Sequence, residues 1–486
     1  MLPSPKNIPE PTPAPDRSVG QVRAKLDQAI TLHQQGLLKD AQAIYEDILN
    51  RQPKNFDALH LLGVLTKQIG NHQAAVNLIS KAITICPNNA ASYSNLGNAL
   101  KELRQLDAAV SSYDRAIAIR SDYAEAYFNR GGALHALKQL DAAVSCYDRA
   151  IAIKSDYAEA YWDKSLSLLL AGDFENGWTL YEWRWRNKKT GLQDREFKQH
   201  LWLGNASLRS KTILIHNEQG LGDTIQFCRY VKLVANLGAR VFLELPRSLM
   251  SLLANLEGVA QLVEKGQALP DFDYQCPLMS LPLAFKTTIE TIPASTPYLH
   301  LDADRVILNN IATEIDNIRE FKVGICWQGS KSYKGDTERS PGIGPFKRLF
   351  QLADIRFFTL QVDSREEFLG AAGSAAHDLG HEIDEHTLPF EETAALIMSM
   401  DLVITSDTSI AHLAGALGKV VWIVLPFVPD WRWMVDREDS PWYPNARLFR
   451  QARRGDWDDV FEQVSLRLKS VLTRETQALW PIADIQ

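Results

Sequence analysis

The sequence predicts an α + α/β protein, in which a helical repeat array is followed by two doubly wound α/β domains. A 23-residue segment that starts at position 105 recurs at position 139 with 21 identical residues, so the repeat period is 34. From about 211, short β-rich runs alternate with helical patterns, as in parallel sheets with crossover helices. These runs fall into two sets, at about 205–305 and 320–475.

The same 34-residue frame extends in both directions from the nearly identical pair. Small residues recur in register, at Gly63, Gly97 and Gly131 and again at Ala75, Ala109 and Ala143. We expect an α-solenoid of about five units over residues 22–190, because each unit buries its apolar face only against a neighbour. The second half of the last unit is unusually aromatic, with Trp178, Tyr181, Trp183 and Trp185. It is either a capping helix that docks on the next domain or an aromatic core seam.

The ends and the bulk composition limit the class of protein. Six prolines in the first fifteen residues predict a disordered tail over residues 1–21. The apolar content of 45% and charged content of 23% are typical of a globular protein, and a net charge of −7 disfavours nucleic acid and anionic membranes as partners. Five scattered cysteines without a CxxC pair argue against a disulfide framework and a zinc site. Because the sequence shows neither a charged-then-apolar signal segment nor an apolar run of about 18 residues, we expect a cytoplasmic protein without a transmembrane segment.

A turn that carries a carboxylate follows the strand-like run at 212–216. Gly220 and Gly222 precede Asp223 and form a candidate acceptor or phosphate loop, because two glycines at such a turn usually let backbone N–H groups approach a phosphate. A dinucleotide fingerprint needs a third glycine where Ile225 stands, although Glu244 occupies the place of a ribose-binding acid. A helix start lowers the pKa of a carboxyl group, so we expect an ionised Asp223 that accepts a proton from a substrate hydroxyl. The alternative is a helix cap.

A second polar turn follows the strand-like run that ends near residue 405. Four polar residues crowd the helix start there: Ser406, Asp407, Thr408 and Ser409. His412 lies four residues after Thr408 and shares its helix face. The start of this helix predicts an anion site to which the hydroxyl groups add donors. The alternatives are simple capping and a packed histidine.

A third candidate is the basic loop after the strand-like run at 321–327. It contains Lys331, Lys334 and Arg339, which suit a diphosphate in an otherwise acidic protein. Because Asp336 and Glu338 partly neutralise these cations, a solvated surface loop is the alternative.

Three further patterns indicate chemistry more weakly. The Asp-Phe-Asp at 271–273 is similar to the metal clamp of some sugar transferases, and residues 377–386 are rich in His and acidic groups but lack metalloprotease spacing. The stretch 429–444 combines Trp, Tyr and Arg, which either stack on a base or sugar or pack in an interface.

The repeat resembles the tetratricopeptide repeat. In the third unit, the residues that carry the resemblance are Tyr93, Leu96, Gly97, Ala109, Tyr113 and Ala116. The resemblance implies a protein or peptide partner that the array recruits.

The three polar motifs, in this order, resemble the heptosyltransferase family, and the whole chain is similar to bacterial proteins that fuse tetratricopeptide repeats to such a glycosyltransferase family 9-like domain. "GLGDTI" matches the family turn that carries the catalytic base, here Asp223, and "SDTSIAHLAGALGK" matches its donor-binding segment. The family positions transferred to this chain are Asp407, Thr408, His412, Leu413, Lys331 and Arg339.

The resemblance implies the GT-B arrangement, in which two Rossmann-like halves enclose the active site. The acceptor side is then residues 205–305 and the donor side residues 320–475. The implied activity is inverting transfer from a nucleotide-diphosphate sugar to an acceptor hydroxyl, without metal or cofactor. A catalytically silent repeat scaffold that binds a nucleotide sugar or a partner protein is the alternative.

Overall fold

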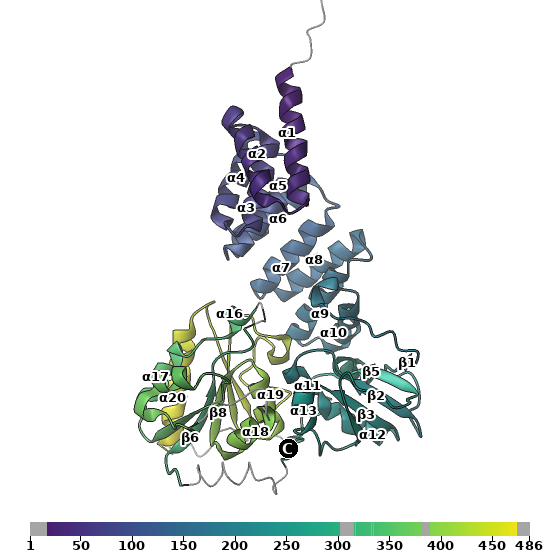
Figure 1. Cartoon of the computed structure of the whole chain (residues 1–486), viewed down its shortest axis with the longest axis vertical. Helices are drawn as coiled ribbons and strands as arrows, with labels where there is room; N and C mark the ends of the chain where they lie inside the picture. The colour runs from purple at the N-terminus through teal and green to yellow at the C-terminus, as the bar shows by residue number, and fades with distance from the viewer. Residues whose placement is uncertain are drawn as a thin grey trace, which may run out of the picture. The chain divides into compact units, whose positions relative to one another are not determined.

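The computed structural model describes residues 17–301, 315, 317–331, 333, 335–380 and 389–473 (Figure 1). The chain divides into two compact units, of which the first ends at Ala160 and the second begins at Tyr161. Residues 1–16 of the predicted tail lie outside the described residues, whereas residues 17–21 belong to the first helix.

The first unit consists of antiparallel helix pairs. Its helices are α1 Arg17–Gln34, α2 Leu38–Arg51, α3 Phe56–Gln68, α4 His72–Ile85, α5 Ala90–Glu102, α6 Leu106–Ile119, α7 Ala124–Ala136 and α8 Leu140–Ile153. From α3 onward, corresponding helices start 34 residues apart, which confirms the repeat period. The turn within each pair also recurs, because the residue two positions before the second helix has a left-handed φ, at Gly36, Gly70, Arg104 and Lys138.

The repeated glycines allow the two helices of a pair to approach closely. A Cβ at Gly97 would lie 2.6 Å from Cε1 of Tyr113, and a Cβ at Gly131 would lie 2.7 Å from Cε1 of Tyr147. Both tyrosines are almost completely buried. The small residue and the aromatic residue of each repeat are therefore complementary parts of one contact.

Two neighbouring glycines of α7 provide a matched test of this packing. Gly131→Ala should destabilise the array by about 1–3 kcal/mol, because the new methyl group overlaps the Tyr147 ring. At Gly132 a Cβ would meet no atom closer than 3.9 Å, so Gly132→Ala should stabilise the helix by up to about 1 kcal/mol. Urea unfolding of both variants measures the difference, and equal shifts would contradict the packing.

The fifth predicted repeat lies almost entirely in the second compact unit. It contains α9 Ala158–Ala171, α10 Phe174–Tyr181 and the 3-10 helix η1 Glu182–Trp185. Trp178 and Tyr181 on α10 are buried against the α/β part of this unit, and Trp178 Nε1 donates a hydrogen bond to the carbonyl of Thr287 at 3.0 Å. Docking of α10 on the following domain, one of the two sequence interpretations, is therefore correct.

The first α/β half is built on a five-stranded parallel sheet. Its strands are β1 His200–Leu201, β2 Thr212–His216, β3 Arg240–Leu245, β4 Val259–Glu264 and β5 Tyr274–Pro277, in the order β1-β5-β2-β3-β4. Its helices are η2 Lys188–Thr190, α11 Leu221–Phe227, η3 Cys228–Tyr230, α12 Val231–Asn236, α13 Arg247–Met250, η4 Leu278–Ser280 and α14 Leu281–Ala284. The strand order reverses between β2 and β5, which is a topological switch point.

The second half contains another five-stranded parallel sheet. Its strands are β6 Phe321–Cys326, β7 Ile355–Thr359, β8 Leu402–Ser406, β9 Val421–Leu425 and β10 Ala446–Arg450, in the order β10-β9-β8-β6-β7. Its helices are α16 Asp336–Arg339, η5 Gly344–Gln351, α17 Arg365–Ala372, η6 Gly373–Ala375, α18 Pro389–Ser399, α19 Ser409–Ala416, η7 Trp431–Trp433 and α20 Trp457–Leu472. The order is that of a doubly wound sheet, with its switch point between β6 and β8.

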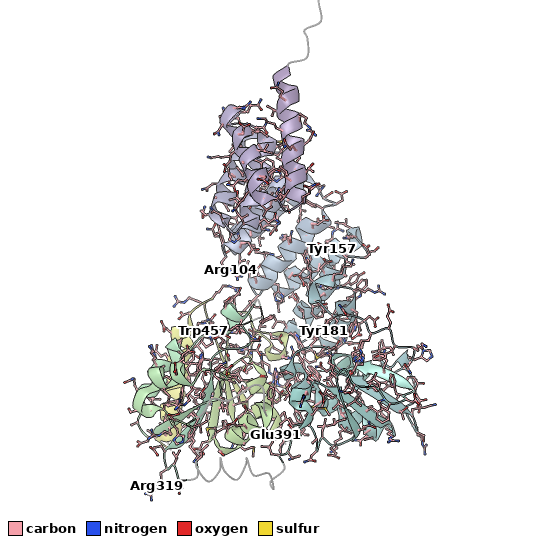
Figure 2. All side chains as sticks on the ribbon, in the orientation of Figure 1. Arg104, Tyr157, Tyr181, Arg319, Glu391 and Trp457 are labelled. Carbon is pink, nitrogen blue, oxygen red and sulfur yellow. The ribbon has the colours of Figure 1, made fainter. Side chains whose placement is uncertain are left out.

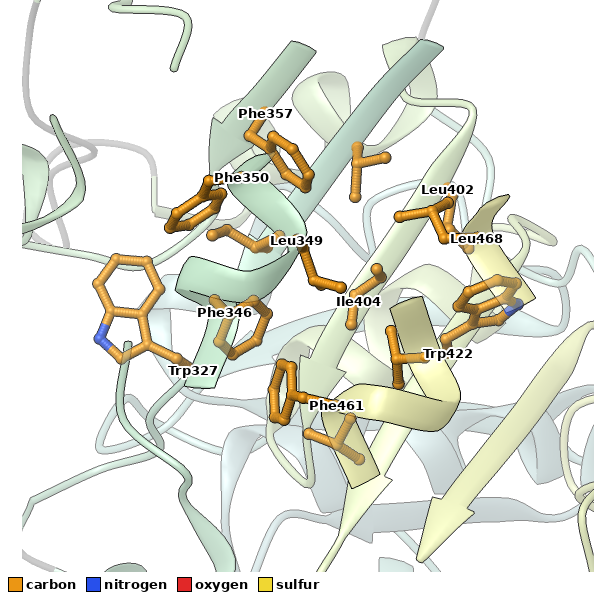
Figure 3. Packing of buried hydrophobic residues seen from close by; sticks show 14 of the residues in the cluster. Trp327, Phe346, Leu349, Phe350, Phe357, Leu402, Ile404, Trp422, Phe461 and Leu468 are labelled. Atoms are coloured by element: carbon orange, nitrogen blue, oxygen red, sulfur yellow. The ribbon is translucent and has the colours of Figure 1, made fainter. Parts of the chain in front are cut away.

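A hydrophobic cluster fixes one face of the second sheet. Figure 3 shows Ile404 and Trp422 of the sheet packed with Phe346, Leu349 and Phe461 from η5 and α20. Because α20 carries apolar residues at helical spacing, its buried face covers the strands and leaves its polar face exposed.

The structure confirms the two parallel sheets. The predicted β-rich runs at 212–216, 240–245, 321–327, 355–361, 401–405 and 420–425 correspond to β2, β3, β6, β7, β8 and β9. No helix among the described residues is long and apolar enough to cross a membrane. The five cysteines all lie in the described part of the chain and form no disulfide bond.

Candidate functional site

The three polar motifs follow strands that flank the two switch points. The turn before α11 follows β2, the basic loop follows β6, and the start of α19 follows β8. Ligands of doubly wound sheets bind beyond the carboxyl ends of strands at such points. The positions of the motifs in the two sheets are therefore those at which a ligand site is expected.

The two halves meet where α11 and α19 lie side by side (Figure 1). A Cβ at Gly222 would lie 2.9 Å from Cδ2 of His412 and 3.3 Å from Cα of Ser409. The close approach of the two helices therefore requires a glycine at position 222. The place of Gly222 in a loop that approaches a phosphate stays a prediction. Gly220 is the N-cap residue of α11.

Asp223 lies in the first turn of α11 and uses both carboxylate oxygens. Oδ2 accepts a hydrogen bond from the Gly220 N–H at 2.8 Å, so the residue does cap the helix. Oδ1 pairs with Nη2 of Arg432 from the second half. Burial raises the pKa of Asp223, whereas Arg432 and the Gly220 N–H lower it. The expected direction, a lowering by the helix start, is therefore wrong, because desolvation outweighs the dipole.

Arg432 forms polar contacts across the two halves, and it was absent from the predicted site. Its guanidinium donates to Asp430 Oδ1 at 2.8 Å, to Gln226 Oε1 at 2.6 Å and to Asp223. Only 7% of its side chain is exposed. The Trp-Arg-Trp sequence at 431–433 was a visible signal, but a sequence pattern does not specify which carboxylate a buried arginine pairs with.

The start of α19 is a compact polar turn. Thr408 is its N-cap residue, and its Oγ1 accepts from the Ile410 N–H at 3.3 Å and lies 3.1 Å from Oγ1 of Thr405. Ser406 is fully buried, and its Oγ has no hydrogen-bond partner within the described residues. Burial raises the pKa of Asp407 to about 6, and the nearby carboxylate of Asp430 adds to this rise.

His412 is a packed, neutral histidine. Its Nδ1 lies 3.0 Å from the hydroxyl of Tyr443, and its ring stacks on Trp433 at 5.5 Å between centroids. Burial holds its pKa well below the usual range, and the positive charge of Arg432 acts in the same direction. The ring faces Gly222 of α11, so His412 lies at the junction of the halves.

The raised pKa of Asp407 predicts a pH-dependent stability. Between about pH 4 and pH 6 the native carboxyl keeps a proton that the unfolded chain releases, so the free energy of unfolding falls as pH rises. The free energy of unfolding of Asp407→Asn should therefore exceed that of wild type by more at pH 7.5 than at pH 4.5, as measured by urea unfolding. A gain of the same size at both pH values would contradict the shift.

Arg339 is the residue of the basic loop after β6 whose contacts are described near the junction. Nε of Arg339 donates to Oδ1 of Asp336 at 3.2 Å, and the guanidinium lies over the ring of Tyr333 at 4.6 Å. The positive charge of Arg339 lowers the pKa of Asp223, Asp407 and His412. Lys331 is exposed, and Lys334 lies outside the described residues.

Within the part of the chain that the structure describes, the residues of the weaker sequence patterns have other roles. Glu244 is fully buried and pairs with Arg195, so it is not available to a ribose. Asp273 of the Asp-Phe-Asp motif accepts from the N–H of Thr212 at 2.8 Å, at the amino end of β2 and away from the switch point. In the described part of the chain no group of three or more His, Cys, Asp or Glu could hold a metal ion. Residues 381–386 of the His-rich stretch lie outside that part.

The aromatic residues at 429–444 form an interface rather than a stacking platform. Trp431 packs edge-on against Trp178 of α10, and Trp442 packs against Phe227 of α11. Arg229 of the first half donates to the Trp442 carbonyl at 2.7 Å. The packing interpretation of this stretch is therefore correct.

Comparisons with known proteins identify the array. Models of the tetratricopeptide repeat match residues 26–90, 78–111, 97–138 and 124–157. The N-terminal region is therefore a tetratricopeptide repeat array, a class of structure that implies a protein partner.

Individual proteins match parts of the chain. Protein FlbA of Caulobacter vibrioides (strain ATCC 19089 / CIP 103742 / CB 15) is 27% identical over 332 residues, which are 62% of this chain and 53% of FlbA. The match thus spans about half the length of that relative. A crystal structure of MamA is 24% identical, covers 34% of this chain and 95% of its own, and has a TM-score of 0.31. The structure of YrrB, described as a TPR protein with an unusual peptide-binding site, is 21% identical over 33% of this chain and 82% of its own, with a TM-score of 0.30.

Proposed function

We propose that the two α/β halves form an inverting glycosyltransferase of the GT-B type. It transfers a sugar from a nucleotide-diphosphate donor to an acceptor hydroxyl and requires no metal ion or cofactor. The observation that carries the proposal is the junction of α11 and α19, because it brings the Asp223 turn of one half next to Ser409 and His412 of the other.

The proposed reaction divides charge between the halves. Asp223 accepts the proton of the acceptor hydroxyl while the hydroxyl oxygen bonds to the anomeric carbon and the bond to the diphosphate breaks. A base on one face of the sugar and a leaving group on the other produce inversion. About a fifth of the Asp223 side chain is exposed, and an oxygen that accepts one hydrogen bond retains a second lone pair, so the carboxylate can receive the proton.

The departing diphosphate needs positive charge and N–H donors, which the second half contains. Arg339 supplies a guanidinium that already acts electrostatically on Asp223 and Asp407. The first turn of α19 adds backbone N–H groups and the Ser409 side chain. The exposed Lys331 is a second cation for the outer phosphate. His412 is assigned to donor binding through its place beside Ser409.

The repeat array recruits a protein or peptide acceptor in this proposal. A silent scaffold that binds a nucleotide sugar or a protein partner is the second candidate, favoured by the occupation of both Asp223 oxygens in the structure. Turnover distinguishes the two, since a scaffold binds the donor and releases no sugar from it.

A thermal-shift screen over nucleoside diphosphates and their sugars tests the donor site. One nucleotide class should raise the melting temperature, and Arg339→Ala should weaken its binding about tenfold or more, because a charged hydrogen bond is lost. Arg348→Ala is the matched control, since Arg348 lies on η5 and pairs with Glu462. Equal affinities for wild type and Arg339→Ala would remove Arg339 from the site, and inhibition of transfer by a chelator would contradict metal independence.

A further inference from the structure

The segment that ends the repeat array contacts both loops that present the candidate site. Tyr181 and Arg184, at the end of α10 and in η1, bind Glu218 and Gln219 before α11. Trp178 and Tyr181 pack on Trp431, which precedes Arg432 in sequence. All of these residues lie in the second compact unit.

Arg184 holds the first loop through a buried, two-pronged contact. Nε and Nη2 donate to Oε2 and Oε1 of Glu218 at 3.0 and 2.9 Å, and neither side chain is more than 2% exposed. Nη2 also donates to Oγ of Ser280 at 2.7 Å, and Glu218 Oε1 accepts from the Met279 N–H at 3.0 Å. The contact therefore joins the loops after β2 and β5, the two strands at the switch point of the first sheet.

This contact lies directly before the candidate base. Gln219 Nε2 donates to the hydroxyl of Tyr181 at 3.1 Å, and the next residue, Gly220, donates its N–H to Asp223. Glu218 is deeply buried, which raises its pKa, whereas Arg184 lowers it. Without the Arg184 fork, Glu218 would be an unpaired buried carboxylate, and the loop would rearrange to solvate or protonate it.

The same segment holds the second loop by aromatic packing. The Trp431 ring lies 5.2 Å from that of Trp178 and 6.2 Å from that of Tyr181, both in edge-on geometry. Trp431 is buried, and the adjacent Arg432 pairs with Asp223. Tyr181, labelled in Figure 2, thus contacts Trp431, the neighbour of Arg432, and Gln219, which precedes the glycine that donates to Asp223.

We propose that α10 and η1 are a positioning element of the site, in which Arg184 and Tyr181 set the Glu218–Gln219 turn that presents Asp223. The last repeat thus serves the transferase half as a structural part of its catalytic turn. This inference rests on the proposed function for the reaction that is affected, whereas the positioning itself is measurable without turnover.

Hydrogen exchange on the full-length chain tests the positioning. Arg184→Lys keeps the charge but loses the planar fork, so amides of 217–224 should exchange about tenfold faster or more. Arg365→Lys is the matched control, because it alters another two-pronged Arg–carboxylate contact, with Asp378 in the second half. Tyr181→Phe is a milder change that removes only the hydroxyl group. It should also speed up exchange of the amides of 217–224, and it keeps the test available if Arg184→Lys folds poorly. Unchanged exchange of 217–224 in both variants would overturn the inference.

Turnover separates a positioning role from mere support. In Arg184→Lys, kcat should fall about tenfold while the KM for the nucleotide sugar stays constant, because the donor contacts lie in the second half. A wild-type kcat despite faster exchange would overturn the inference. If the wild-type chain neither binds nucleotide nor transfers sugar, but 217–224 still exchanges faster only in the Arg184 and Tyr181 variants, the proposed function fails and the positioning element stands.

Discussion

Asp223→Asn should lower the rate of sugar transfer about a thousandfold and leave donor affinity unchanged. The asparagine amide has nearly the same shape and can still accept from the Gly220 N–H, so the turn is preserved, but it cannot take a proton from the acceptor. In the wild-type protein the transfer rate should fall as the pH is lowered, because Asp223 becomes protonated. The fall should occur above the usual aspartate range, because burial raises the pKa of Asp223. Single-turnover kinetics measures the chemical step directly.

Asp430→Asn is the control for this result. Asp430 pairs with the same guanidinium at 2.8 Å, so its replacement also removes one carboxylate from Arg432. It leaves Asp223 intact, and transfer should fall less than about tenfold if loss of charge around Arg432 is the only effect. Equal losses in both variants would mean that the ion pair, rather than a proton acceptor at position 223, supports the activity.

Arg432→Met should destabilise the second compact unit by about 3 kcal/mol, a typical cost of breaking a buried ion pair. The guanidinium is nearly inaccessible, and its loss leaves the Asp223 carboxylate and the Gln226 side chain without their partner from the other half. The value lies at the lower end of the usual range because Asp223 keeps some solvent contact. Urea unfolding at pH 7 measures it.

The double variant Asp223→Asn with Arg432→Met should recover at least about 1 kcal/mol of this loss, because both charges are then removed. Arg356→Met is a matched control, since Arg356 pairs with Glu320 at a more exposed position and should cost less than about 1 kcal/mol. Strict additivity of the two single changes would show that Asp223 and Arg432 do not interact in solution.

The sequence was most informative where a pattern repeats or a strand is long and apolar. The 34-residue period predicted the helical array and the small residues, such as Gly97 and Gly131, at which its helices cross closely, and the β-rich runs predicted β2, β3 and β6 to β9. It did not indicate β1, β4, β5 or β10. β1 has only two residues, β5 only four, and Gln261 and Arg447 interrupt the apolar character of β4 and β10. Short or edge strands of this kind have little periodicity to detect.

The sequence predicted where the residues of the candidate site lie along the backbone. It did not predict the ion-pair partner of Asp223 or the direction in which its pKa is shifted. Turns after parallel strands lie at the carboxyl edge of their own sheet, which placed Asp223 and His412 at the ends of β2 and β8. That the two turns face each other was implied by the resemblance to the GT-B arrangement. The partner of Asp223 could not be predicted, since Arg432 is distant in sequence and its pairing depends on how the two halves pack. The pKa of Asp223 was predicted in the wrong direction because helix polarity is visible in a sequence, whereas burial is a property of the folded chain.

The most direct measurement of the central claim is hydrogen exchange with and without the nucleoside diphosphate that gives the largest thermal shift. A site shared by both halves predicts slower exchange at 335–340 and 406–412 in the donor half and at 217–224 across the junction. Protection confined to other segments, with these three unchanged, would show that the nucleotide binds elsewhere and that the α11–α19 junction is not the site.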